Sequence, residues 1–312
     1  MDHPLPTPPA RSTCLVYLGS PELAVSPLRA LIAAGFEVPL VVSRSDRRRG
    51  RGAGLSPSPV KAAALELGLA VTDDVEALLE VPADLGVVVA YGRIIKPHLL
   101  ARLPFVNLHF SLLPRWRGAA PVERALLAGD GRTGVCVMAL EKGLDTGGVY
   151  RSAEVPIGPD DTLEGLRGRL VSLGTDLLLA CLRDGFGVPV PQGGEPVYAA
   201  KIDPAELQLV WARPAVELVR TVRVGRAWTT FRGKRLLVHE ATVVPHPSGE
   251  GAAAGADTSV PGELALVDGT LRVATGVGWL ALGLLQPEGR ARLDAPAWRN
   301  GAQPKPGEML GS

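Results

Sequence analysis

Three side chains that could carry proton chemistry stand in two stretches of the chain, Asn107 and His109 in one and Asp145 in the other. Asn107 and His109 are two residues apart in an apolar run, residues 103–109, so in a strand both side chains project from the same face. An amide can donate a hydrogen bond to a developing oxyanion, and an imidazole can move a proton. Asp145 follows His109 by 36 residues in a turn-rich loop and could orient or charge that imidazole. A buried histidine satisfied by the backbone, beside turn-forming asparagine and aspartate, explains the same residues without any chemistry.

A sheet must position these side chains, and the first part of the chain predicts one. Apolar, strand-like runs stand at 14–18, 38–42, 69–71, 85–90 and 103–109, and helical patterns at 21–35, 57–68, 75–80 and 119–128. The hydrophobicity of these strands is continuous rather than alternating, which favours a mostly parallel sheet covered on both faces. Strands at 134–140 and 149–155 and a helix at 162–183 would complete it. We therefore predict a doubly wound α/β domain over residues 12–188.

The remaining segments have a different composition. The proline-rich residues 1–11 are predicted to be disordered, and the segment 189–208, rich in Pro and Gly, is predicted to be a linker. A helical pattern at 214–224 then precedes five short runs at 228–231, 235–244, 263–267, 270–274 and 278–285. Short strands separated by turn signals favour a small β-barrel over 209–312, with a long loop at 245–262.

Composition limits the class of protein. The chain has 312 residues, of which 46% are hydrophobic and 21% charged, as expected for a soluble globular protein of one large domain or two ordinary ones. Cys14, Cys136 and Cys181 show no metal-ligand spacing, so we expect buried free thiols and no metal site. The start of the chain lacks the apolar region of a secretory signal, and the run 85–91 is too short to span a bilayer. We therefore expect a cytoplasmic protein.

Two basic clusters interrupt an otherwise balanced charge, since the net charge is only +1. The loop 46–52 contains four arginines in five positions, and arginine forks match phosphate geometry. The second cluster opens the C-terminal region and consists of Arg213, Arg220, Arg223, Arg226, Arg232, Lys234 and Arg235. Two such clusters favour a large polyanion such as RNA, although the loop could also be only a solvated one. Trp228 and Phe231 could stack on nucleotides or belong to the core. A dinucleotide site is poorly supported, because Gly19-Ser20-Pro21 lacks the second and third glycines.

The stretch 107–121 resembles a family signature. Its Ser-Leu-Leu-Pro-Arg-Trp-Arg-Gly is similar to the Ser-Leu-Leu-Pro-x-x-Arg-Gly of folate-dependent formyltransferases, and the continuation to Ala-Ala-Pro resembles members that act on methionyl-tRNA. Supporting matches stand at 19–21, 56–61, 88–92, 128–134, 143–147, 198–201 and 285–289. The resemblance implies a Rossmann-like formyltransferase domain and a C-terminal OB-like tRNA-binding barrel.

The resemblance also implies a reaction, in which 10-formyltetrahydrofolate donates its formyl group to the α-amino group of methionine on the initiator tRNA. It implies that Asn107 and His109 serve the oxyanion and proton steps while Asp145 holds His109 in its productive state. Folate contacts are implied at Val89, Ala90, Tyr91, Gly92, Ser111, Leu112, Leu113, Pro114, Leu140 and Gly143. Contacts with tRNA are implied at Arg47, Arg48, Arg49, Arg51, Arg223 and Arg226, of which Arg51 aligns with the key arginine of the family. We expect a monomer.

Three positions depart from the family pattern. Phe110 stands where glycine is usual, and the segments 207–211 and 224–228 lack the residues that are usual there. We expect a local packing change at Phe110 with the chemistry retained, and altered tRNA contacts at the other two segments. One alternative is a formyltransferase that acts on an amino-sugar nucleotide, and another is an inactive tRNA-binding homologue in which Phe110 fills the pocket. The arginine loop argues against the former, and the intact trio against the latter.

Overall fold

The chain divides into two compact units. The structure is a computed structural model that describes residues 5–48, 54–245, 259–305 and 307–312. The N-terminal unit comprises residues 1–124, 131–157 and 165–201, and the C-terminal unit comprises 125–130, 158–164 and 202–312. No helix among the described residues is long and apolar enough to cross a membrane.

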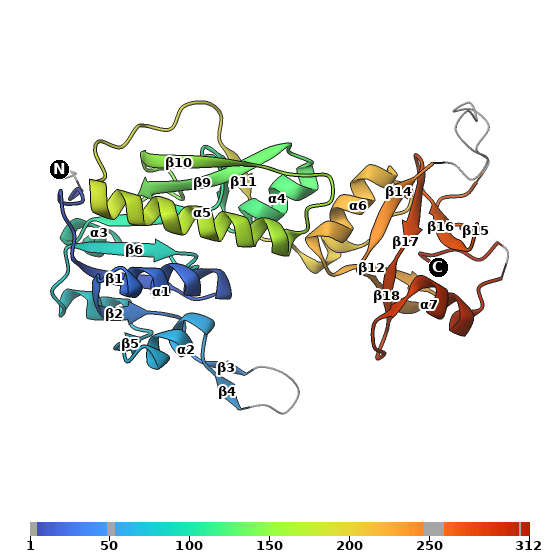
Figure 1. Ribbon diagram of the computed structural model, residues 1–312, viewed down its shortest axis with the longest axis horizontal. Helices are drawn as coiled ribbons and strands as arrows, with labels where there is room; N and C mark the ends of the chain where they lie inside the picture. Colours follow the sequence, from blue (N-terminus) through green and yellow to red (C-terminus); the bar gives the residue numbers. More distant parts are fainter. Residues whose placement is uncertain (1–4, 49–53, 246–258, 306) are drawn as a thin grey trace. The chain divides into compact units, whose positions relative to one another are not determined.

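A seven-stranded sheet forms the centre of the N-terminal unit (Figure 1). Its order is β10-β9-β7-β6-β1-β2-β5, with bounds Val149–Pro156, Arg132–Ala139, Phe105–His109, Leu85–Val89, Cys14–Gly19, Glu37–Val42 and Val71–Thr72. The strands from β7 to β5 pair in parallel, whereas β9 pairs antiparallel with both β7 and β10. The sheet is therefore mixed, with an antiparallel ribbon at one edge. Exposed and partly buried residues alternate along much of β10, as expected for an edge strand with one solvated face.

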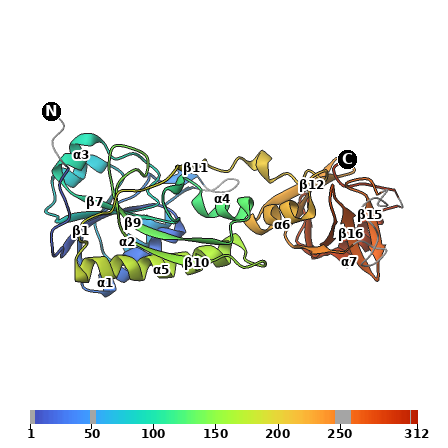
Figure 2. The same cartoon turned by 90° about the horizontal axis from the view of Figure 1, so that it is seen from above.

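Helices cover both faces of this sheet, so the predicted doubly wound arrangement is confirmed. Figure 2 shows α1 (Val25–Ala33) and α5 (Leu163–Asp184) on one face and α3 (Pro97–Arg102) on the other. The remaining helical elements are η1 (Glu22–Ala24), α2 (Pro59–Glu66), η2 (Val75–Leu79) and α4 (Pro121–Ala128). The helix predicted at 75–80 is a 3-10 helix, and α3 was not predicted, because its six residues are too few to show a period.

Register decides which face β7 presents to each layer. Gly86 pairs with Phe105 and Val88 with Asn107 in parallel register, so these side chains share a face. Phe105 belongs to the apolar cluster that contains Leu99 of α3. Leu108 points the opposite way, since a Cβ on Gly174 of α5 would lie 3.1 Å from its side chain. Asn107 therefore lies on the face opposite α5, and His109, two residues on, lies there too.

Two short ribbons complete the N-terminal unit. β8 (Arg115–Gly118) pairs in parallel with β11 (Val197–Ala199), and β3 (Arg47–Arg48) forms a hairpin with β4 (Leu55–Ser56). β11 lies inside the segment predicted as a linker. Pro and Gly in that segment indicated irregular structure, but they did not exclude a three-residue strand.

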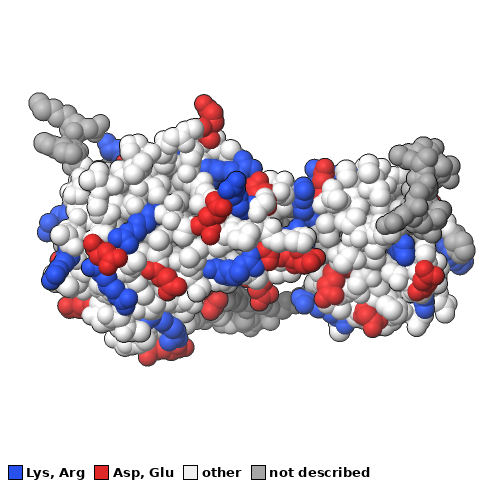
Figure 3. Space-filling view, turned by 45° about the horizontal axis from the view of Figure 1, so that its top comes forward, with Lys and Arg blue, Asp and Glu red and all other residues white. Residues whose placement is uncertain are grey.

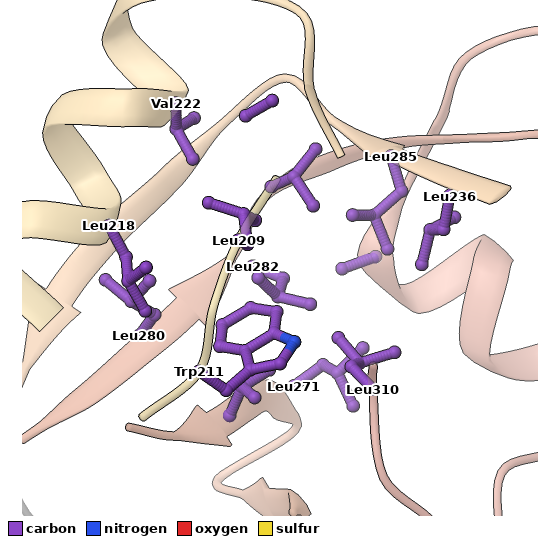
Figure 4. Close-up of a cluster of buried hydrophobic side chains, with 14 of the residues drawn as sticks. Leu209, Trp211, Leu218, Val222, Leu236, Leu271, Leu280, Leu282, Leu285 and Leu310 are labelled. Carbon is purple, nitrogen blue, oxygen red and sulfur yellow. The ribbon is translucent and has the colours of Figure 1, made fainter. Parts of the chain in front are cut away.

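The C-terminal unit is built from α6 (Ala215–Val224) and two four-stranded antiparallel sheets. One sheet has the order β12-β13-β18-β19 (Ala227–Phe231, Lys234–Val238, Leu284–Pro287, Leu293–Asp294). The other has the order β14-β17-β16-β15 (Ala241–Val244, Trp279–Leu282, Thr270–Ala274, Leu264–Val267). η3 (Pro204–Leu207) precedes them and α7 (Ala295–Ala302) follows. Figure 4 shows the shared core, in which Trp211 packs among leucines from α6 and the strands.

Two predicted strands of this unit are each divided in two. The pattern at 235–244 forms β13 and β14, and the pattern at 278–285 forms β17 and the first half of β18. The two breaks lie side by side. His239 N–H and Glu240 N–H both donate to the Leu284 carbonyl, and Gly283 N–H donates to the Glu240 carbonyl. Both segments thus pass from one sheet to the other at the same corner. Hydrophobic periodicity alone does not reveal such a corner.

Candidate active site

Asn107, His109 and Asp145 meet on the face of β7 opposite α5. His109 Nδ1 lies 3.6 Å from Asp145 Oδ2, and Asn107 Nδ2 lies 3.5 Å from Asp145 Oδ1. Both β7 residues are buried, and the Asp145 side chain is 11% exposed. The distances lie at the long end of polar contacts, as is common before a substrate brings such groups together. The structure therefore brings the three predicted residues into one cluster.

The backbone of β8 holds the Asp145 carboxylate. Gly118 N–H donates to Asp145 Oδ2 over 2.7 Å. Gly118 has φ +115°, and a Cβ there would lie 3.0 Å from the Ala199 carbonyl oxygen of β11, so only glycine fits without strain. Asp145 itself has φ +51°, a left-handed conformation that aspartate tolerates better than most residues.

A backbone carbonyl fixes the hydrogen on one nitrogen of His109. His109 Nε2 lies 2.9 Å from the Trp116 carbonyl oxygen. A carbonyl only accepts, so this hydrogen bond assigns the proton to Nε2. In the neutral imidazole the lone pair is then on Nδ1, the nitrogen that faces Asp145. A proton taken up at Nδ1 would produce an imidazolium beside a carboxylate, which is a favourable pair.

The loop after β7 contains residues predicted to contact folate. Ser111 is fully buried and its hydroxyl donates to the Arg115 carbonyl, so that side chain is used within the loop. Leu112 packs against Gly134 of β9, where a Cβ would lie 2.5 Å from its side chain. The Pro114 carbonyl, after a cis Leu113–Pro114 bond, accepts from Val197 N–H of β11. The side chains of Ser111 and Leu112 thus shape the loop. Phe110, the departure from the family glycine, is 7% exposed.

The other predicted folate contacts lie at the end of β6 and just beyond β9. Ala90 and Gly92 both have left-handed backbones, φ +46° and +77°, directly after Val89, the last residue of β6. The Tyr91 ring lies in the apolar cluster with α3, and its burial raises the pKa of its phenol although the Arg93 guanidinium opposes the shift. Tyr91 can thus offer its main chain more readily than its side chain.

The loop after β9 starts on the core and is exposed at its tip. Leu140 N–H donates to the Phe105 carbonyl, and the Leu140 side chain packs against the cluster that contains α3. Gly143 is exposed, and a Cβ there would lie 2.4 Å from the Thr146 hydroxyl oxygen.

A glutamine that the sequence reasoning missed contacts the same loop. Gln192 Oε1 accepts from Arg117 Nε over 3.0 Å and from Arg117 Nη2 over 2.7 Å. Its Nε2 donates to the carbonyls of Asp145 and Gly147, each over 2.8 Å. Gln192 stands in the segment predicted as a linker, where no spacing or period distinguished it.

The cysteines offer no alternative chemistry. Burial raises the pKa of the Cys136 and Cys181 thiols to about 11, so both remain protonated at neutral pH. All three cysteines are free, as predicted, although Cys14 is only partly buried. Within the described parts of the chain, no three His, Cys, Asp or Glu side chains are grouped so that they could hold a metal ion.

The residues predicted to bind tRNA have contrasting environments. Arg47 and Arg48 are exposed in β3, whereas Arg49 and Arg51 lie outside the described residues. Arg226, two residues after the end of α6, is also exposed. The Arg223 guanidinium instead donates to the carbonyls of Asp161 and Gly158 over 2.6 and 2.7 Å, and partial burial lowers its pKa. These bonds tie α6 to the segment 158–164 of the same unit.

Other arginines of the second basic cluster are also engaged within their unit. Arg232 pairs with Glu308 over 2.7 Å, Arg213 pairs with Glu217 over 3.2 Å, and Arg220 donates to the Ala128 carbonyl. Arg235 lies over the ring of Trp228, 4.4 Å from its centroid. On the face shown in Figure 3, lysines and arginines alternate with acidic side chains and do not form a field of one sign.

Comparisons with known proteins agree over both units. Residues 15–182 match the family described as Formyl transferase, and residues 201–303 the family described as Formyl transferase, C-terminal domain. A methionyl-tRNA formyltransferase of Symbiobacterium thermophilum is 43% identical over 305 residues, which cover 92% of each chain. One from Heliobacterium modesticaldum is 40% identical, covering 95% of this chain and 99% of the relative.

Solved structures share the fold at low identity. An N-formyltransferase from Helicobacter canadensis, in complex with folinic acid and dTDP-3-aminofucose, has a TM-score of 0.64 at 16% identity and covers 88% of this chain and 99% of its own. HypX from Aquifex aeolicus in complex with tetrahydrofolic acid has a TM-score of 0.63 at 16% identity. The match covers 96% of this chain but 48% of HypX, so this chain spans about half the length of that protein.

Proposed function

The chain belongs to the Formyl transferase family, and from this premise we propose that it formylates the α-amino group of initiator methionyl-tRNA with 10-formyltetrahydrofolate as the donor. Its relatives named methionyl-tRNA formyltransferase are 38–43% identical over more than nine-tenths of the chain. The observation that carries the proposed mechanism is the cluster of Asn107, His109 and Asp145, which are assembled from two distant stretches of sequence.

Asn107 stabilises charge in this proposal. When an amine attacks a formyl carbon, negative charge develops on the formyl oxygen and the amine must lose a proton. The Asn107 amide has two N–H donors and directs one of them at Asp145, which leaves the second for the formyl oxygen. One such donor contributes about 3 kcal/mol of transition-state stabilisation in comparable sites.

His109 and Asp145 manage the proton. The Trp116 carbonyl keeps a hydrogen on Nε2, so Nδ1 is the nitrogen that can take up the proton from the amine. Asp145 faces Nδ1 at 3.6 Å and stabilises the resulting imidazolium, while Gly118 N–H holds the carboxylate in place. Charge thus forms on His109 next to the group that compensates for it.

The residues around the cluster fit a folate. Ala90, Tyr91 and Gly92 lie past the last β6–β7 pair, Val88–Asn107, so their peptide groups lie outside that ladder. Left-handed turns at Ala90 and Gly92 redirect those peptide groups, which suits main-chain recognition of a flat heterocycle. We assign the pterin to this turn and to the loop 140–145. Bound there, the folate supplies the formyl carbon.

The tRNA is assigned to the exposed arginines. Within the described part of the chain, no hydrogen bond joins the guanidinium groups of Arg47, Arg48 and Arg226 to a carbonyl as in Arg223, so we retain these three as phosphate contacts and remove Arg223 from that set. Arg49 and Arg51 remain predicted tRNA contacts that lie outside the described residues. We also propose that the two C-terminal sheets form an OB-like barrel and that the enzyme acts as a cytoplasmic monomer.

A formylation assay tests the proposal. Purified protein is incubated with 10-formyltetrahydrofolate and initiator tRNA charged with labelled methionine, and N-formylmethionyl-tRNA is measured after hydrolysis. We expect product only when both substrates are present. Absence of formylmethionine from a preparation that still binds folate would refute the proposed function.

A further inference from the structure

Gln192 is placed where it can control the position of Asp145. Its side-chain amide lies between two elements of the site, the guanidinium of Arg117 in β8 and the loop that carries Asp145. We propose that Gln192 is a positioning residue for formyl transfer, a clamp that holds Asp145 against His109. This inference rests on the proposed catalytic role of Asp145.

The four hydrogen bonds of Gln192 require an amide. Arg117 presents two donors, so its partner must accept, whereas the Asp145 and Gly147 carbonyls only accept, so their partner must donate. Among the side chains long enough to bridge these groups, only glutamine accepts at one end and donates twice at the other. A glutamate could keep the Arg117 bonds but would set its other oxygen against two carbonyl oxygens.

The loop that carries Asp145 needs such a clamp. Residues 141–144 are exposed, so packing does not hold the tip of the loop. The ends of the loop are bound to the sheet, where Leu140 N–H donates to Phe105 and Ala139 N–H to Gly148. Between these ends, the Gln192 amide binds the main chain of Asp145 itself, which has an unfavourable left-handed backbone.

Gln192 is itself fixed in advance. Val190 on one side exchanges two backbone hydrogen bonds with Val149, over 2.8 and 2.9 Å. Val197 on the other side begins β11, which pairs with β8. The chain is anchored to the sheet before Gln192 and to β8 after it. The segment that carries the amide therefore has little conformational freedom before a substrate binds. Such preorganisation is what a positioning residue requires.

The clamp also joins both groups that hold Asp145. Arg117 directly precedes Gly118, whose N–H binds the Asp145 carboxylate over 2.7 Å. Gln192 thus sets the spacing between the donor that binds the carboxylate and the main chain that carries it. A shift of 1 Å in such a site can lower a rate by about 100-fold.

Two variants of Gln192 test the clamp. Gln192→Met has a similar length and removes all four hydrogen bonds, while Gln192→Glu retains acceptors for Arg117 and loses the donors toward the loop. We expect kcat for methionyl-tRNA to fall about 100-fold in both variants. The KM values for tRNA and folate should change less than twofold, because Gln192 is assigned no contact with either substrate.

Gln286→Met is the matched control. Gln286 is a partly buried glutamine of the C-terminal unit that is paired with His239 Nε2 over 3.0 Å and donates to the Arg290 carbonyl over 3.0 Å. Its substitution removes two side-chain hydrogen bonds, against four at Gln192, so Tm should fall in this variant while kcat stays at the wild-type value. A merely structural role for Gln192 predicts the same pattern for Gln192→Met.

Hydrogen exchange at the Gly118 amide tests the position of Asp145 without a measurement of activity. This amide is protected by its bond to Asp145, so we expect faster exchange in both Gln192 variants than in the wild type. A wild-type kcat in Gln192→Glu, or unchanged Gly118 exchange in both variants, would overturn the clamp. If wild-type protein failed to formylate methionyl-tRNA, the proposed function would fall, and Gly118 exchange alone would decide whether Gln192 positions Asp145.

Discussion

Two groups of polar side chains in this molecule make polar contacts for different purposes. In the N-terminal unit, Asn107, His109 and Asp145 contact one another, and backbone groups of β8 orient two of them. In the C-terminal unit, Arg223 and Arg232 bind carbonyls and a carboxylate of their own unit. In the first group, backbone groups orient side chains that can act on a substrate. In the second, side chains hold the backbone.

The difference limits what counting residues can reveal. A cluster of arginines in the sequence predicted a surface for a polyanion, but several of those guanidinium groups are already satisfied within the unit. An arginine has five donors and can join loops as readily as it can bind phosphate. Charge therefore indicates a ligand only where the structure leaves the guanidinium exposed.

The largest effect is expected at the site itself. We predict that His109→Ala lowers kcat by about 1,000-fold, because it removes the group that we propose takes up the amine proton. Affinity for tRNA should stay near the wild-type value, measured by filter binding. His239→Ala is the control, since His239 also makes one side-chain hydrogen bond but lies in the C-terminal unit. Comparable losses of kcat in the two variants would contradict the assignment of proton transfer to His109.

Arg223 and Arg226 form a matched pair three residues apart, of which one is engaged and one exposed. Arg223→Ala leaves two carbonyls without a donor, so we expect the free energy of unfolding to fall by roughly 2 kcal/mol. Arg226→Ala should leave stability unchanged, weaken tRNA binding a few-fold and reduce the slope of log K against log salt concentration by about 1. Urea denaturation and binding titrations at several salt concentrations measure both. A loss of stability in Arg226→Ala together with a loss of tRNA binding in Arg223→Ala would mean that Arg226 is the structural residue and Arg223 the tRNA contact.

The smallest effect is expected for the exposed pair Arg232–Glu308. The bond to Arg232 lowers the pKa of Glu308 from 4.5 to about 2. A carboxyl group whose pKa is lower in the folded state contributes stability at a pH above its pKa in the unfolded state. That contribution is lost as the pH falls through the pKa of the folded state. The difference in Tm between the wild type and Glu308→Gln should therefore be small at neutral pH and vanish between pH 4.5 and 2. A constant difference over that interval would show that the ion pair does not contribute.

Much of the fold could be predicted from hydrophobic runs. The five parallel strands and α5 follow from continuous apolar runs and helical periods of adequate length. The relative direction of neighbouring strands was harder to predict, because an apolar run such as 134–140 does not show that β9 lies antiparallel to β7. The divided strands at 239–240 and 283 were missed for a similar reason, since hydrophobicity continues through a corner.

The site was predictable only in part. Same-face spacing indicated Asn107 and His109, and a turn-rich loop with a supporting family match at 143–147 indicated Asp145, all of which the structure brings together. The groups that orient them were not accessible from sequence. The Trp116 carbonyl and Gly118 N–H are backbone groups, and Gln192 acts through a contact between residues 47 positions apart. The type of a residue indicates what chemistry it can do. The orientation of its side chain depends on tertiary contacts that leave no local pattern in the sequence.

The central claim is that this site transfers a formyl group to methionine carried by tRNA. The most direct measurement is kcat/KM for initiator methionyl-tRNA and for a dTDP-amino sugar, each with 10-formyltetrahydrofolate and the same enzyme preparation. We expect the tRNA to be preferred by at least about 1,000-fold, because exposed arginines and the C-terminal unit would contribute binding only to a polyanion. An equal or greater kcat/KM for the amino sugar would contradict it.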